Sequence, residues 1–190
     1  KIRLADLRTY TIYHGLVPYI QKFCEERDYT LEIDGDIQAA ENYSLAEAKT
    51  FIESLKLPHE VRDYQLKSFV HAIRNKRMLL LSPTASGKSL IIYLLYRQFL
   101  DYQGLKGLII VPTTSLVEQL YSDFADYSNA NGWEVDKYVH RIYQGKDKQS
   151  NKNVFISTWQ SIYQLGPEYF EQFDFVIGDE AHLFKAQSLT

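Results

Sequence analysis

Short apolar runs alternate with longer amphipathic stretches through most of this sequence, and that alternation restricts the fold more than any other feature. The apolar runs have the length of buried strands and cover residues 78–82, 107–112, 153–158 and 173–179. Apolar residues recur at helical spacing in the neighbouring stretches, 61–76, 88–102 and 115–127. Strands that alternate with helices form βαβ units, in which helices cover both faces of a parallel sheet. The pattern therefore predicts an α/β fold.

The amino-terminal part of the chain follows a different pattern. Loose alternation predicts a strand over 1–13, apolar spacing predicts a helix over 17–28, and 30–34 is a second candidate strand. Ser44 and the glutamate three residues later have the spacing of a capping box, which opens another helix. Pro58 closes that helix, because proline cannot continue it.

The change of pattern at Pro58 marks a predicted domain boundary. Residues 1–57 form a small α+β accessory domain in this prediction, and residues 58–190 form the α/β domain, which is itself incomplete. The sequence does not begin with methionine, so we expect it to be an excerpt of a longer protein.

Composition excludes several classes of protein. The formal charge of -3 reflects 21 Lys and Arg against 24 Asp and Glu, so local groups must hold any anion that the chain binds. The single cysteine, Cys24, excludes an internal disulfide and a multi-cysteine zinc site, and it suits a reducing intracellular compartment. No apolar run approaches the ~20 residues that span a bilayer, so we expect no membrane partner.

The segment from Ser82 to Ser89 has the spacing S-x-x-x-x-G-K-S, which is typical of a phosphate-binding loop between a strand and a helix. In such a loop, backbone N–H groups wrap a phosphate and the positive end of the next helix points at it. Lys88 adds a mobile charge, and the Ser89 hydroxyl can ligate Mg²⁺. The remaining residues predicted to bind the phosphates are Thr84, Ala85, Ser86 and Gly87. The plainer interpretation is an ordinary turn.

Two carboxylates end the apolar run 173–179, at the carboxyl end of a predicted strand, where open α/β sheets bind ligands. The residues Asp179, Glu180, Ala181 and His182 resemble a DEAH box. Asp179 would then hold Mg²⁺ through water, and Glu180 would orient or deprotonate the water that attacks the γ-phosphate. His182 would lie near that phosphate. The alternative is that the acidic pair only forms a solvent-exposed end of the strand and that the histidine has a structural role.

Together, the loop and the DEAH box make the chain similar to the first motor domain of a superfamily 2 helicase, with ATP and Mg²⁺ as cofactors. Arg62 and Gln65 in VRDYQ resemble the R-x-x-Q element that precedes the loop in several branches of this superfamily. The resemblance implies that Gln65 reads the adenine edge. By itself this element is weak, because helix starts often carry Arg and Gln.

Two further stretches resemble helicase motifs that meet a nucleic-acid backbone. The resemblance implies such contacts for Thr113 and Thr114 in IIVPTTSLVEQL, and for Thr158 and Gln160 in ISTWQS. The segment 141–153, RIYQGKDKQSNKN, carries four basic residues against one acidic residue. It is either a solvated loop or a stretch that lies along a duplex.

Within the superfamily, PTASGKSLI, IIVPTTSLVEQL, STWQS and DEAHL most resemble the UvsW-type DNA helicases of tailed phages. The resemblance implies a branched-DNA substrate in recombination, repair and replication restart, inside an infected bacterial host. It makes residues 1–57 the end of a substrate-recognition region. It also implies a second RecA-like domain, which supplies the arginine fingers and the remaining DNA contacts.

Other functions compete with this interpretation. A restriction-system motor or an RNA helicase shares the same motifs. From another class, the chain could be a nucleic-acid-binding module without catalysis, although Lys88, Asp179 and Glu180 are intact. A P-loop kinase or transporter ATPase is disfavoured, because DEAH, VPTTSL and STWQ have no role there.

Overall fold

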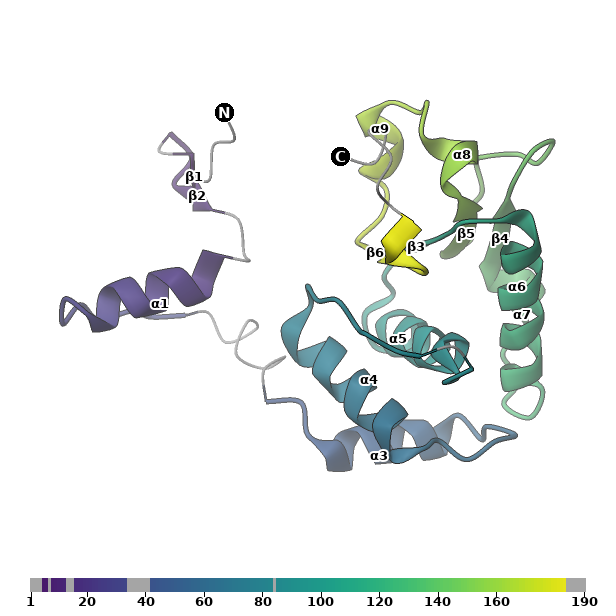
Figure 1. The fold of residues 1–190 in the computed structure, drawn as a ribbon, viewed down its shortest axis with the longest axis horizontal. Helices are drawn as coiled ribbons and strands as arrows, with labels where there is room; N and C mark the ends of the chain where they lie inside the picture. Colours follow the sequence, from purple (N-terminus) through teal and green to yellow (C-terminus); the bar gives the residue numbers. More distant parts are fainter. Residues whose placement is uncertain (1–4, 7, 13–15, 34–41, 84, 184–190) are drawn as a thin grey trace.

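The computed structural model describes residues 5–6, 8–12, 16–33, 42–83 and 85–183. Its first elements are a short hairpin and a helix, drawn in purple in Figure 1. β1 (Ala5–Asp6) and β2 (Thr11–Ile12) pair antiparallel, and α1 (Val17–Glu25) follows. The predicted helix is therefore confirmed. Of the strand predicted over 1–13, the described residues form two short strands, and residues 1–4, 7 and 13 lie outside the described residues. Residues 30–33 form no strand, and residue 34 lies outside the described residues.

α3 (Leu45–Ser54) begins with the predicted capping box. The Ser44 N–H donates to the Glu47 carboxylate at 2.7 Å, and the Glu47 N–H donates to Ser44 Oγ at 3.1 Å. These bonds satisfy two N–H groups that the start of a helix leaves without a partner. The helix gives way to a turn before Pro58, as predicted, and α4 (Asp63–Asn75) follows.

The main sheet of the described part has four parallel strands in the order β4-β5-β3-β6. These strands are β3 (Gly107–Val111), β4 (Val139–Ile142), β5 (Val154–Thr158) and β6 (Phe175–Gly178). The long helices are α5 (Lys88–Gln103) and α6 (Thr114–Ser128). The short turns are α7 (Val135–Tyr138), α8 (Trp159–Ile162), α9 (Pro167–Phe170) and the 3-10 turn η2 (Ala181–Leu183). Within the described ranges, no helix is long and apolar enough to cross a membrane.

Side chains that alternate along the strands fill a core on each face of the sheet. Ile109 and Ile156 pack with α4, α5 and α6 on one face. Leu108 and Phe155 pack with the buried residues of α8 and α9 on the other. Figure 1 shows these two groups of helices on opposite sides of the sheet. The predicted α/β fold with helices on both faces is confirmed.

The sheet differs from the prediction in two places. Residues 78–82 form no strand, and the side chains of Leu79 and Leu81 are 67% and 91% exposed. An apolar run forms a buried strand only where a neighbour pairs with it, and no described strand pairs with this run. β4 was not predicted, because His140 and Arg141 interrupt its apolar pattern. Those polar side chains are tolerated because β4 lies at the edge of the sheet.

α3 packs into the same core as α4 and α5. Its residues Ala48, Phe51 and Leu55 are buried there, and Phe51 stacks on Phe69 of α4 with ring centroids 5.8 Å apart. The predicted boundary near residue 57 stays a prediction. Because α3 buries its apolar face against α4, we propose that the packing unit of the α/β domain begins at α3.

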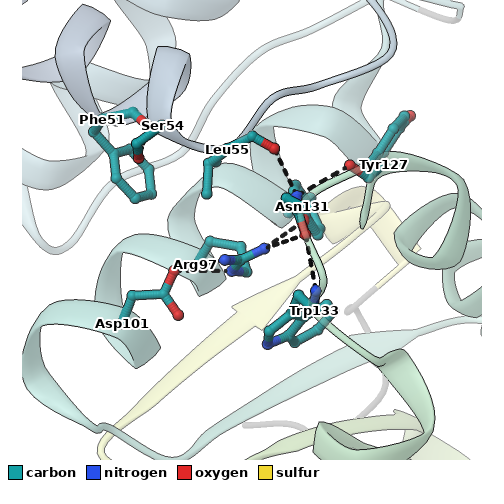
Figure 2. Close-up of polar contacts among 9 residues, drawn as sticks. Phe51, Ser54, Leu55, Arg97, Asp101, Tyr127, Asn131 and Trp133 are labelled. Atoms are coloured by element: carbon teal, nitrogen blue, oxygen red, sulfur yellow. Dashed lines mark hydrogen bonds and ion pairs between the residues drawn. The ribbon is translucent and has the colours of Figure 1, made fainter. Parts of the chain in front are cut away.

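A polar network fastens the end of α3 to α5 (Figure 2). Asn131, in the turn after α6, donates through Nδ2 to the Leu55 carbonyl at 2.7 Å and to the Tyr93 hydroxyl at 3.2 Å. Its Oδ1 accepts from Arg97 Nη1 at 3.4 Å. The Arg97 guanidinium is buried, pairs with Asp101 at 2.8 Å and donates to the Tyr93 hydroxyl at 2.7 Å. Because unpaired polar groups in a core are costly, this network favours one arrangement of the helices.

Candidate functional site

The predicted phosphate-binding loop ends at Gly87, whose backbone lies in the left-handed region with φ +74°. A Cβ at this position would lie 2.4 Å from Gln65 Nε2, so a larger residue would displace the glutamine. Ala85 also has a positive φ, of 60°, which is uncommon for a residue with a side chain. The chain thus turns sharply into α5. Thr84, the other residue predicted here, lies outside the described residues.

Residues at the start of α4 hold the loop through its carbonyl groups. Gln65 is buried; its Oε1 accepts from the Arg62 N–H at 2.9 Å, and its Nε2 donates to the carbonyls of Ser86 and Gly87 at 3.1 and 3.4 Å. The Tyr64 hydroxyl donates to the Ser86 carbonyl at 2.7 Å, and Arg62 Nη1 donates to that hydroxyl at 3.0 Å. Arg62 and Gln65 therefore lie beside the loop. Contact between Gln65 and adenine stays a prediction. For that contact, the Gln65 amide must give up its present hydrogen bonds to the protein.

Lys88 joins the loop to the acidic pair that follows β6. Its Nζ donates to Glu180 Oε1 at 2.6 Å and lies 3.9 Å from Asp179 Oδ1. The hydrogen bond with Glu180 is the main cause that raises the pKa of Lys88, so the ammonium stays charged at neutral pH. The backbone of Asp179 continues the sheet by donating to the Ile110 carbonyl at 2.9 Å. The backbone of His182 belongs to η2, and its side chain lies outside the description.

Ser89, the predicted Mg²⁺ ligand of the loop, is engaged with α6. Its Oγ lies 2.9 Å from the Tyr127 hydroxyl. Burial raises the pKa of the Asp123 carboxyl, and the nearby Ser89 hydroxyl opposes that shift. The described part of the chain holds no cluster of three or more His, Cys, Asp or Glu that could bind a metal ion by itself. Mg²⁺ usually takes one or two protein oxygens and completes its shell with phosphates and waters. Ser89 and Asp179 each carry an oxygen of the kind that Mg²⁺ prefers, Ser89 as a direct ligand and Asp179 through water.

The four residues predicted to meet a nucleic-acid backbone line one cavity of about 660 Å³ at the carboxyl ends of β3 and β5. Thr113 caps α6, because its Oγ1 accepts from the Leu116 N–H at 3.3 Å, and Thr114 follows it. Thr158 is buried, with its Oγ1 2.8 Å from Ser161 Oγ. The structure therefore brings this predicted set together, with the Thr158 hydroxyl already engaged within the protein. The other lining residues are Pro112, Tyr143, Gln144, Gly145, Lys146, Lys148 and Ser161.

Two tyrosines at these sites escaped the sequence analysis. Tyr64 precedes Gln65 in VRDYQ, so its place in that element was a usable signal. Tyr127 contacts Ser89 only because α6 packs against α5, and nothing in the local sequence indicates that contact. By contrast, the basic residues of the segment 141–153 did signal the loop that lines the cavity.

A family model described as DEAD/DEAH box helicase matches residues 62–189. The chain belongs to this family, and its parallel sheet with helices on both faces is that of a RecA-like helicase domain. The match includes the phosphate-binding loop, the acidic pair and the residues that line the cavity.

Individual relatives cover more of the chain. It is 33% identical over 199 aligned residues to the ATP-dependent DNA helicase uvsW of Enterobacteria phage T4, an alignment that covers 100% of this chain and 39% of the relative. It is 26% identical to the DNA 3'-5' translocase XPB2 of Sulfurisphaera tokodaii, over 85% of this chain and 33% of the relative. A crystal structure of the UvsW helicase of bacteriophage T4 superposes with a TM-score of 0.75 and 32% identity, over 98% of this chain and 68% of that chain. The chain thus spans well under half the length of these curated relatives.

Proposed function

We propose that this chain is the ATP-binding part of an ATP-dependent DNA helicase or translocase. The contact of Lys88 with Glu180 carries the proposal, since it joins the phosphate-binding loop to an acidic pair 92 residues away in sequence. A lysine that can hold β- and γ-phosphates then lies beside carboxylates suited to a Mg²⁺ ion and an attacking water. When bound, Mg²⁺ would neutralise phosphate charge, with Ser89 as a direct ligand and Asp179 holding it through water.

For the substrate, we propose branched DNA, remodelled in recombination, repair and replication restart. The likeness to a phage DNA helicase over the full chain favours DNA. An RNA helicase or a restriction-system motor remains the alternative, because the motifs are shared. We further propose that a second RecA-like domain completes the motor and that it works inside an infected bacterial cell. Of residues 1–57, the part that precedes α3 would then belong to a substrate-recognition region.

Nucleotide binding tests the proposal most directly. Lys88→Ala should weaken the binding of a fluorescent ATP analogue in the presence of Mg²⁺ by about 10- to 150-fold, because hydrogen bonds to charged groups are worth roughly 1.5–3 kcal/mol. Fluorescence titration of both proteins gives the two dissociation constants.

Lys137→Ala is the matched control. Lys137 also pairs with a glutamate, at 2.5 Å from Glu134, but that pair is exposed on α7. The control should leave the affinity for the analogue unchanged. Equal affinities for the wild-type protein and Lys88→Ala would contradict the assignment of the loop.

The cavity beside Thr158 makes a separate prediction for DNA binding. Lys146 and Lys148 line it. Log affinity falls as log salt concentration rises, and each lysine that contacts a phosphate adds about 0.9 to the steepness of this slope. The double change Lys146→Ala and Lys148→Ala should therefore make that slope shallower by about 1 to 2. It should weaken binding to every DNA sequence alike. Gln160→Ala should weaken binding similarly without changing the slope.

A double change of Lys49 and Lys67 to Ala removes the same charge from exposed sites on α3 and α4. It should leave the slope for forked DNA unchanged, as measured by fluorescence anisotropy between low and moderate salt. If both double variants lower the slope equally, overall charge rather than this cavity governs DNA binding.

A further inference from the structure

The Ser89 hydroxyl, the predicted Mg²⁺ ligand of the loop, is hydrogen-bonded to a tyrosine of α6 in the structure. Its Oγ lies 2.9 Å from the Tyr127 hydroxyl, on a helix that begins well after the loop. A hydroxyl has one proton to donate and two lone pairs, so the bond to Tyr127 takes up part of the capacity of the Ser89 hydroxyl.

The Tyr127 side chain is held firmly. Its ring packs edge-on against Tyr93, with centroids 5.4 Å apart, and against His59 at 6.5 Å. Its backbone carbonyl accepts from Asn131 Nδ2 at 3.4 Å, within the network that reaches α3. Figure 2 shows the Tyr127 side chain extending away from Asn131. Burial is the main cause that raises the pKa of Tyr127, so its hydroxyl stays protonated at neutral pH and can donate or accept.

We propose that Tyr127 is a positioning residue that holds the Ser89 hydroxyl against α6 until a nucleotide-bound Mg²⁺ ion competes for it. This inference rests on the proposed function of the loop. Binding of the metal–nucleotide complex competes with the bond between Ser89 and Tyr127, whereas nucleotide without metal needs no metal ligand from Ser89. Tyr127 therefore sets how much Mg²⁺ the site requires, and it does so without touching the nucleotide.

The change Tyr127→Phe tests the proposal, because it removes the hydroxyl and keeps the ring that packs against Tyr93. Mg²⁺ should increase the affinity of the protein for a fluorescent ADP analogue. The variant should reach half of that increase at a Mg²⁺ concentration about 2- to 12-fold lower, which corresponds to one ordinary hydrogen bond. In EDTA, the wild-type protein and the variant should bind the analogue equally.

Two controls isolate the contact. Tyr121→Phe removes a hydroxyl on the same helix that bonds to Asp136, away from Ser89, and should leave the Mg²⁺ requirement unchanged. In a Ser89→Ala background, Tyr127→Phe should have no further effect, as a double-mutant cycle requires for interacting residues.

Three results would decide against the proposal. An unchanged Mg²⁺ requirement in Tyr127→Phe overturns it, and so does an equal gain in affinity with and without metal. A full effect of Tyr127→Phe in the Ser89→Ala background also overturns it. If the wild-type protein binds no nucleotide under either condition, the proposed function of the loop fails, and the inference falls with it.

Discussion

These 190 residues are expected to bind ATP with Mg²⁺ but to release phosphate roughly 10³- to 10⁵-fold more slowly than a protein in which they are joined to a second RecA-like domain. That range is what an arginine finger contributes to phosphoryl transfer, since it neutralises charge that develops on the γ-phosphate. Arg62 donates to the Tyr64 hydroxyl beside the loop, and Arg97 is buried against Asp101. Both of these arginines are therefore committed to structural contacts.

Steady-state phosphate release, with and without forked DNA, measures this difference. In the two-domain protein, Glu180→Gln should abolish turnover and leave the affinity for ATP intact, because the amide cannot accept a proton from the attacking water. The 190-residue chain should show little stimulation by DNA and no unwinding. Strong DNA-stimulated turnover by this chain alone would mean that the two-domain mechanism is wrong for this protein.

Loss of the Arg97 guanidinium should produce the largest change in stability. In Arg97→Met, the stem is kept, but the Tyr93 hydroxyl, Asn131 Oδ1 and the Asp101 carboxylate lose a donor. Removal of one partner from a buried ion pair costs about 3–5 kcal/mol, and the partial exposure of Asp101 reduces this to about 2–4 kcal/mol. Urea unfolding, followed by circular dichroism, measures the change in the free energy of unfolding.

A second change separates the lost guanidinium from the carboxylate that it leaves behind. When Asp101→Leu is added to Arg97→Met, much of the loss should be recovered, because no unpaired charge remains near the core. Lys137→Ala, which breaks an exposed pair with Glu134, should leave the unfolding midpoint unchanged. A loss in Arg97→Met no larger than that of the exposed pair would mean that the network of Figure 2 does not hold α3 to α5.

Local sequence patterns predicted the helices and strands that can be recognised from the spacing of their own apolar residues. α6 carries an apolar face at helical spacing, and α5 is a long apolar stretch that is buried on all sides. β3, β5 and β6 are apolar runs bounded by polar residues, so each could be located without knowledge of its neighbours. The Ser44 capping box was predicted for the same reason, since its bonds join residues three positions apart. The apolar run 78–82 was predicted wrongly, because a strand also needs a partner.

The sequence by itself also determined which residues could carry the chemistry. The spacing of Gly87, Lys88 and Ser89 and the pairing of Asp179 with Glu180 are properties of short segments. Only the tertiary structure decided which of these residues meet. The parallel order of β3 and β6 brings the acidic pair to Lys88, whereas the packing of α6 draws Ser89 to Tyr127. Contacts between distant segments depend on how whole elements pack, and a short sequence pattern does not contain that information.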